Sequence, residues 1–183
     1  MAITIHLETA DDPREPGAGS AQPVRWSIIE SPVGPLFAAE HGGRIVRLGF
    51  LGDDEPQPDP EWVRDDDALG ELRAQLGEYF EGERTGFDLD VGIEGTEFQV
   101  AVWQALARIP FGATATYGEI AAAIGRPKAV RAVGGANNKN PVSIVVPCHR
   151  VIGADGSLTG FGGGLPTKET LLSLEAGVSA GAG

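Results

Sequence analysis

The chain has 183 residues, of which 42% are hydrophobic and 22% are charged. These values are ordinary for a folded protein, and the length suits one medium domain or two small ones, so a wholly disordered chain is excluded. No apolar run is long enough to cross a bilayer, and Met1–Gly19 lacks the basic and apolar parts of a signal peptide, so we expect a cytoplasmic protein without membrane contact. The single cysteine excludes an internal disulfide and a Cys-rich zinc site, which leaves a packing residue or a reactive thiol.

The formal net charge is −12, which argues against DNA as a partner because DNA binding needs positive charge near the phosphates. The acidic residues, however, lie in the first half. Residues 1–94 hold 7 Lys and Arg against 21 Asp and Glu, whereas residues 95–183 hold 7 against 5. Ile120–Ala154 contains no acidic residue. A local basic surface is therefore compatible with the acidic total, and scattered solvated charges are the alternative.

The start of the chain predicts a flexible arm over residues 1–22, because Glu8–Gln22 is rich in Asp, Glu, Pro, Gly and Ala and has no periodicity. Three short β-prone runs follow, separated by Ser-Pro-Val-Gly and His-Gly-Gly turn signals, and they predict a small antiparallel sheet. These runs are Val24–Glu30, Pro35–Glu40 and Arg44–Phe50.

Gly52–Asp67 contains three prolines and eight acidic residues, which predicts a surface loop or linker. Apolar residues at helical spacing then predict one amphipathic helix packed on the sheet. They are Leu69, Leu72, Leu76, Tyr79 and Phe80. Gly82–Gly95 is expected to lead out of this N-terminal α/β domain, which we place at residues 23–94.

The rest of the chain predicts a mainly helical domain over residues 95–176, followed by a flexible tail over residues 177–183. Apolar residues within Phe98–Leu106 mark a helix that stops before Pro110. The expected fold class is therefore α+β, with a small antiparallel sheet and helix first and a mainly helical domain second.

A helix-turn-helix is predicted in the second domain. Thr116 and Glu119 form a capping box, so a helix should run from about Tyr117 to Ile124 and end at Gly125.

Pro127 suits the first turn of the next helix, which carries Lys128 and Arg131 and should end at Gly134-Gly135. Two short helices joined by a tight turn, the second of them basic, favour DNA contact. A helix pair that only packs a core is the alternative.

The cysteine follows Val142–Val146, an apolar run that predicts a buried strand. A lone cysteine after a buried strand is commonly an inert hydrophobic residue. Cys148, however, is followed directly by His149 and Arg150, and a nearby histidine or cation lowers the pKa of a thiol. Because adjacent side chains of an extended segment point apart, His149 should reach the sulfur only through a water or a bend.

A histidine acting as a base needs a third group that orients it. Glu175 lies four residues after Leu171 on the apolar face of a final helix that begins near Pro166. An acid on a buried face needs a partner, and His149 would supply one; a solvated glutamate at a frayed helix end is the alternative. Gly160–Gly164 lets the backbone approach a flat ligand but lacks a phosphate fingerprint, so no nucleotide cofactor is expected.

The sequence Pro147-Cys148-His149-Arg150-Val151-Ile152 resembles the active-site motif of the O6-alkylguanine-DNA alkyltransferases, also called methylated-DNA protein-cysteine methyltransferases. Further motifs occur in that family's order and spacing, and the similarity covers residues 95–175 tightly. Val24–Phe87 resembles the family's N-terminal domain more weakly. The further motifs are Thr116–Ala121, Arg131–Ala136, Asn140-Pro141 and the Gly-Phe-Gly-Gly-Gly loop.

The resemblance implies a catalytic role for five residues. Cys148 would take the alkyl group of O6-alkylguanine, and of O4-alkylthymine, irreversibly and once per molecule. His149 would accept the thiol proton through a water while Glu175 holds the imidazole. Tyr117 would donate to guanine N3, and Asn140 would brace the active-site turn.

The resemblance also implies residues that bind substrate and DNA. The carbonyl of Val151 would accept from the guanine amino group, and the loop at Gly162 and Gly163 would contact the base. Arg131 would fill the space left by a flipped nucleotide, next to small residues that let the helix lie in the minor groove. The expected DNA-binding residues are Arg131, Ala129, Ala132, Gly134 and Arg150. The expected partner is double-stranded DNA carrying O6-alkylguanine, bound by a monomer without cofactor or metal.

Two other function classes compete with this interpretation. Alkyltransferase-like proteins bind alkylated guanine without reacting, but they lack the cysteine that Cys148 supplies here. A cysteine hydrolase would use Cys148 and His149, but no separate oxyanion motif supports one.

Gly162 stands where the alkyltransferases often carry Ser or Ala, and Phe161 stands where Tyr is frequent, so two side-chain hydroxyl contacts are not expected.

Overall fold

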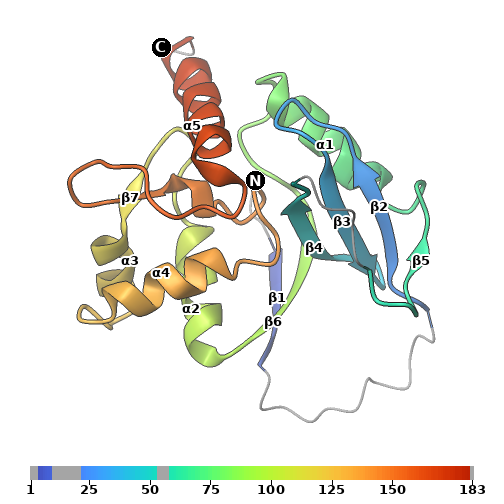
Figure 1. The fold of residues 1–183 in the computed structure, drawn as a ribbon, viewed down its shortest axis with the longest axis horizontal. Coiled ribbons are helices and arrows are strands. Elements are labelled where there is room, and N and C mark those ends of the chain that lie inside the picture. The colour runs from blue at the N-terminus through green and yellow to red at the C-terminus, as the bar shows by residue number, and fades with distance from the viewer. Residues whose placement is uncertain (1–3, 10–21, 53–57, 182–183) are drawn as a thin grey trace.

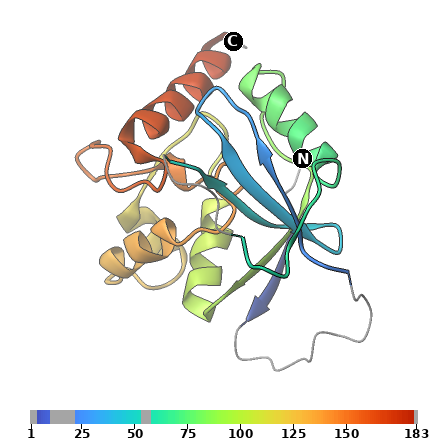
Figure 2. The ribbon, with the colours of Figure 1, turned by 45° about the vertical axis from the view of Figure 1, so that its right-hand side comes forward.

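The computed structural model describes residues 4–9, 22–52 and 58–181. A sheet with helix α1 forms one side of the molecule, and the other helices form the second side (Figure 1). Figure 2 shows the sheet between α1, in green, and the helical part that contains α4 and α5, in orange and red. The α+β class predicted from the sequence is therefore confirmed.

The sheet has six strands in the order β1-β6-β4-β3-β2-β5. Neighbours β2, β3 and β4 pair antiparallel, as the turn signals predict. The strands are β1 Thr4–Thr9, β2 Arg25–Ile29, β3 Leu36–His41, β4 Arg44–Phe50, β5 Val63–Arg64 and β6 Asp90–Gly95.

The whole sheet is mixed, because three further strands extend the antiparallel strands that the sequence predicts. Strand β6 pairs parallel to both β1 and β4, and β5 pairs parallel to β2. For the β4–β6 pair, the crossover that parallel pairing needs contains α1, Gly70–Phe80, which lies between these two strands in the chain. Strand β6 contributes only Val91 and Ile93 to the core, one on each side of Gly92, and so short an apolar pattern is a weak strand signal.

Residues 4–9 form β1 and pair along the whole of β6, which corrects the flexible arm for this part of the chain. The rest of the predicted arm, at residues 10–21, lies outside the described residues. Helix α1 packs on the sheet as predicted, with Leu72, Leu76 and Tyr79 buried.

The helical part begins with α2, Glu97–Leu106, which ends before Pro110 as predicted. Thr116 caps α3, Tyr117–Ala123, through the predicted capping box with Glu119. The remaining elements are α4 Val130–Asn138, the 3-10 helix η1 Cys148–Arg150, α5 Gly164–Gly181, and the short parallel pair β7 Ala115–Thr116 and β8 Val151–Ile152.

The basic helix differs from its predicted bounds. It begins at Val130 rather than Pro127, and it continues through Gly134-Gly135 instead of ending there. Burial explains the continuation: Ala136 packs in the core and its carbonyl accepts from Trp103 Nε1 at 2.9 Å, which outweighs the cost of about 1 kcal/mol for a helical glycine.

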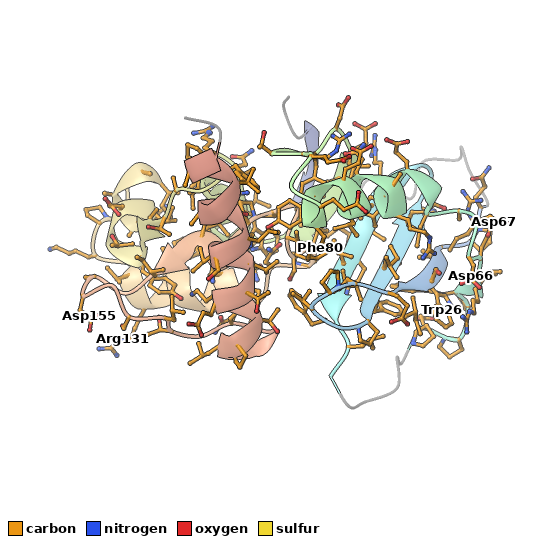
Figure 3. The ribbon with its side chains drawn as sticks, turned by 90° about the horizontal axis from the view of Figure 1, so that it is seen from above. Trp26, Asp66, Asp67, Phe80, Arg131 and Asp155 are labelled. Carbon is orange, nitrogen blue, oxygen red and sulfur yellow. The ribbon has the colours of Figure 1, made fainter. Side chains whose placement is uncertain are left out.

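Helix α5 continues to Gly181, so residues 177–181 are helical and not the predicted flexible tail. Val178 packs closely over Gly82, which has a φ of +77° and no room for a Cβ atom. Helix α5 therefore lies at the boundary between the two parts, as seen from above in Figure 3. Among the described residues, no helix has the length and hydropathy required of a membrane span.

Candidate active site

The segment before Cys148 is buried, as predicted, but it is not a regular strand. Val142–Val146 makes only isolated bridges, one of them to Leu48 of β4. A turn at Ile144, whose φ of 70° is rare for a β-branched residue, interrupts the extended backbone. The segment is fixed to the sheet instead, since Leu48 N donates to Pro141 O at 2.9 Å and Ser143 N donates to Leu48 O at 2.8 Å.

The thiol of Cys148 lies at the start of η1 and is 4% exposed. Burial raises its pKa, while the side chains of Asn140 and Ser143 and the positive charge of Lys168 act in the opposite direction. The sulfur lies 4.0 Å from Ser143 Oγ. A thiol with a raised pKa needs a base before it can act as a nucleophile.

His149 and Glu175 form the buried pair that the sequence predicts. Both are fully buried, and His149 Nε2 lies 2.8 Å from Glu175 Oε1. Burial alone would raise the pKa of Glu175, but hydrogen bonds from His149 and Arg150, together with the electrostatic effect of these two groups, lower it to about 2. The solvated glutamate that was the alternative is excluded.

The tautomer of His149 follows from this pairing. An ionised carboxylate only accepts hydrogen bonds, so Nε2 must carry the proton and Nδ1 must carry the lone pair. Nδ1 is buried and has no partner among the described residues. Burial lowers the pKa of His149, although Glu175 opposes this, so the imidazole is neutral near pH 7 and Nδ1 can accept a proton.

Arg150 belongs to the same cluster, so its predicted role in DNA binding was wrong. It is 7% exposed, and its Nε and Nη2 each lie 2.9 Å from Glu175 oxygens. Its Nη1 donates to Ile109 O at 2.7 Å. A buried carboxylate needs a compensating cation, and Arg150 supplies it.

Asn140 braces the segment before the cysteine on two sides. Its Nδ2 donates to Val146 O at 2.7 Å, and its Oδ1 accepts from Val142 N at 3.1 Å. Asn137 lies close by, with Nδ2 3.5 Å from Cys148 O. These contacts fix the main chain on which the thiol is carried.

Two further segments flank η1. The hydroxyl of Tyr117, at the start of α3, donates to Thr159 O at 3.3 Å. Phe161 packs edge-on against Phe50, and a Cβ atom on Gly163 would lie 2.7 Å from that Phe50 ring. Gly163 therefore permits a close approach of loop and sheet, whereas Gly162 is exposed with open space beside it.

An open groove runs along α3 and α4. It is lined by Tyr117, Lys128, Ala129, Val130, Arg131, Ala132 and Gly134. Arg131 lies at the outer end of the helical part, far from Asp66 and Asp67 at the opposite end of the molecule (Figure 3). The structure thus brings the predicted DNA-binding residues together except for Arg150. Among the described residues, no cluster of His, Cys, Asp and Glu could hold a metal ion.

Comparison with known proteins identifies the family. Residues 97–177 match the family described as 6-O-methylguanine DNA methyltransferase, DNA binding domain, and residues 24–93 match its ribonuclease-like domain. A methylated-DNA–protein-cysteine methyltransferase of Methanosarcina acetivorans is 50% identical over 82% of this chain and 97% of its own length. The chain belongs to the 6-O-methylguanine DNA methyltransferase family.

Solved methyltransferase structures agree in fold. The Mycobacterium tuberculosis OGT in complex with DNA is 49% identical, with a TM-score of 0.80 over 85% of this chain and 94% of that one. An O6-methylguanine DNA methyltransferase from Methanococcus jannaschii is 28% identical, with a TM-score of 0.58 over 82% of this chain and 93% of that one.

Sequence reasoning missed two buried residues of this methyltransferase site. Tyr79 OH donates to Glu175 Oε1 at 2.8 Å, although Tyr79 comes from α1 in the N-terminal part. Lys168 precedes Glu175 by seven residues, which places both on the buried face of α5. A tyrosine on an apolar helix face signals that its hydroxyl needs a partner, but the sequence does not reveal which one.

Tyr79→Phe should lower the free energy of unfolding by about 1 kcal/mol, because it removes one hydrogen bond to a buried carboxylate and keeps the ring. The ring contacts with Phe80, Phe87 and Phe111 stay in place. Urea denaturation measures the change. Tyr117→Phe is the matched control, since its hydroxyl is not in the core, and it should cost much less; equal losses would contradict an interdomain role for Tyr79.

Proposed function

We propose that the protein repairs O6-alkylguanine, and also O4-alkylthymine, in double-stranded DNA by moving the alkyl group to Cys148. The thiolate attacks the alkyl carbon, so a C–S bond forms as the C–O bond to the base breaks. The product is a thioether that water does not cleave, and each protein molecule therefore reacts once. The observation that carries this proposal is the buried Cys148-His149-Glu175 sequence of groups, with a free lone pair on His149 Nδ1.

His149 acts as the base in this proposal. The thiol proton passes to Nδ1, through a bridging water, and the positive charge that forms on the ring faces Glu175. The carboxylate is already ionised because its pKa is about 2. Glu175 therefore favours the charged imidazole and fixes its orientation.

The walls of the pocket recognise the base. The Tyr117 hydroxyl donates to guanine N3 as the leaving base gains charge. The main-chain carbonyls of Cys148 and Val151 accept from the guanine amino group. The N–H of Gly162, a residue with open space beside its Cα, donates to the base oxygen. Gly163 keeps the loop close to the sheet, and Asn140 braces the turn that carries the thiol.

The groove on α3 and α4 binds the DNA. A base inside a duplex cannot reach a buried thiol, so the nucleotide must be turned out of the stack. The small side chains of Ala129, Ala132 and Gly134 let α4 approach the minor groove, and exposed Arg131 fills the vacated space. Minor-groove contacts read little sequence, which suits repair at any site.

Intact-mass measurement tests the function. The protein is mixed with an equimolar duplex that contains O6-methylguanine, and the mass should rise by about 14 Da, the difference between a methyl group and a hydrogen. Peptide mapping should place the label on Cys148. Repeated turnover, or a label on another residue, would overturn the proposal, and binding without a mass change would favour a lesion-binding protein.

Arg131→Ala should slow repair of a methylated duplex at least tenfold but leave reaction with free O6-benzylguanine base nearly unchanged. The reason is that only the duplex needs a side chain to fill the space left by the flipped nucleotide. Quenched-flow mass analysis gives both rates. Arg126→Ala is the matched control, since Arg126 is also exposed but lies before α4. Equal losses on duplex and free base would mean that Arg131 supports the fold or the pocket.

A further inference from the structure

Lys168 is a buried charge that the proposed reaction does not use. It lies in α5 and is fully buried. Within the described part of the chain, no carboxylate lies at ion-pair distance from its ammonium group. Instead Nζ donates to two main-chain carbonyls, Val151 O at 2.5 Å and Thr159 O at 2.9 Å. Burial of an ammonium group with only neutral partners costs several kcal/mol, so this position requires a reason.

The two carbonyls belong to two segments of the proposed site that are separate in the sequence. Val151 follows η1 directly, only three residues after Cys148. Thr159 begins the loop that contains Gly162 and Gly163, and its carbonyl also accepts from the Tyr117 hydroxyl. One ammonium group therefore links the cysteine turn, the glycine-rich loop and, through Thr159, the start of α3.

The charged and titratable groups around Lys168 define its electrostatic role. Cys148 and His149 lie on η1, the Tyr117 hydroxyl at the start of α3 shares the Thr159 carbonyl with Lys168, and Glu175 on its own helix is turned toward Arg150. The positive charge of Lys168 lowers the pKa of Cys148 and of His149. In turn, burial lowers the pKa of Lys168 while the charge of Cys148 raises it. Of these groups, the Cys148 thiolate is the anion whose charge raises the pKa of Lys168.

We propose that Lys168 is a positioning residue for alkyl transfer, whose buried ammonium group stabilises the Cys148 thiolate and fixes the Val151 and Thr159 walls of the pocket. The Lys168 ammonium group and the Cys148 thiolate form an ion pair only after the thiol proton has moved to His149. The effect on the pocket rests on the proposed function, whereas the effect on the thiol does not.

Lys168→Met tests the proposal, because methionine has similar length and no charge. The rate of Cys148 alkylation by iodoacetamide is measured from pH 5 to pH 10, and its midpoint should move up by about one pH unit, with a roughly tenfold slower reaction near pH 7. Reaction with O6-benzylguanine should fall further, because the pocket walls are also released. Lys168→Arg keeps the cation and should restore the midpoint, and Arg108→Met, which removes an exposed cation of the same part, should behave as wild type.

An unchanged iodoacetamide midpoint for Lys168→Met would overturn the proposal. If wild-type protein does not react with O6-benzylguanine but the midpoint shifts, the proposed function fails while the role of Lys168 stands. If Lys168→Met does not fold, the wild-type protein provides the test: NMR of the Lys168 ¹⁵Nζ group should show a lower ammonium pKa after iodoacetamide has alkylated Cys148. The same pKa before and after alkylation would overturn the proposal.

Discussion

Cys148→Ala should abolish alkyl transfer completely while the protein still folds and binds DNA. The chain has no other cysteine, and the contact of the thiol with Ser143 Oγ is long, at 4.0 Å, so its loss should leave the main chain in place. Binding of a duplex with O6-methylguanine, measured by fluorescence anisotropy, should match that of the wild-type protein. Intact-mass analysis of the same mixture should show no added methyl group.

Cys148→Ser provides the control for this result. Serine keeps a polar atom at the position, but its hydroxyl is far more difficult to ionise than a thiol, so transfer should also be lost. Residual transfer in Cys148→Ala would mean that another nucleophile accepts the alkyl group. Loss of DNA binding together with transfer would mean that the cysteine maintains the fold of the turn.

The separation of charge in the sequence corresponds to a separation in space. The acidic first half forms the sheet part, where Asp66 and Asp67 lie at one end of the molecule, and Arg131 lies at the other (Figure 3). A DNA duplex that contacts α4 at Arg131 therefore stays away from Asp66 and Asp67. A net charge of −12 is for this reason compatible with a DNA-binding groove, because only the local charge acts within a Debye length of about 8 Å.

The sequence predicts those parts of the fold that rest on local signals. Capping by Thr116 and apolar spacing in Leu69–Phe80 depend on neighbours within one helix, and the structure contains both helices. Strands β1 and β6 depend on each other, since six pairs of residues join segments more than eighty residues apart. Each strand alternates polar and apolar residues, with Ile5 and Leu7 in β1 and Val91 and Ile93 in β6, but the sequence alone does not reveal that these two short runs pair.

The residues of the site divide in the same way, into those that local sequence signals reveal and those that depend on contacts across the fold. His149 and Glu175 could be paired from the sequence, because an acid on an apolar face requires a partner and few candidates exist. Arg150 was placed on the DNA surface because its charge was counted without its burial. Tyr79 and Lys168 act through contacts made across the fold, and the sequence shows only that they lie on apolar helix faces.

Glu175→Gln should both slow alkyl transfer and destabilise the protein. The neutral amide no longer favours a charged imidazole, so His149 becomes a weaker base and the thiolate should form at higher pH. We expect transfer near pH 7 to fall by roughly 10²-fold, a size typical for loss of assistance to a general base. The affinity for DNA should stay nearly unchanged, because Glu175 is fully buried and does not line the groove on α3 and α4.

The stability effect of Glu175→Gln has a definite dependence on pH. The pKa of Glu175 falls from 4.5 to about 2 in the folded state, so its contribution is present above pH 4.5 and is lost as the pH falls toward 2. At neutral pH this difference corresponds to about 3 kcal/mol of unfolding free energy. Urea denaturation from pH 2 to pH 7 should show that the difference in free energy of unfolding between the wild-type protein and Glu175→Gln decreases as the pH falls from 4.5 to 2. Glu169→Gln, which changes an exposed acid on the same helix, should change neither stability nor transfer. A constant difference at all pH values, or a wild-type pH–rate profile for Glu175→Gln, would mean that the carboxylate fills space in the core without supporting His149.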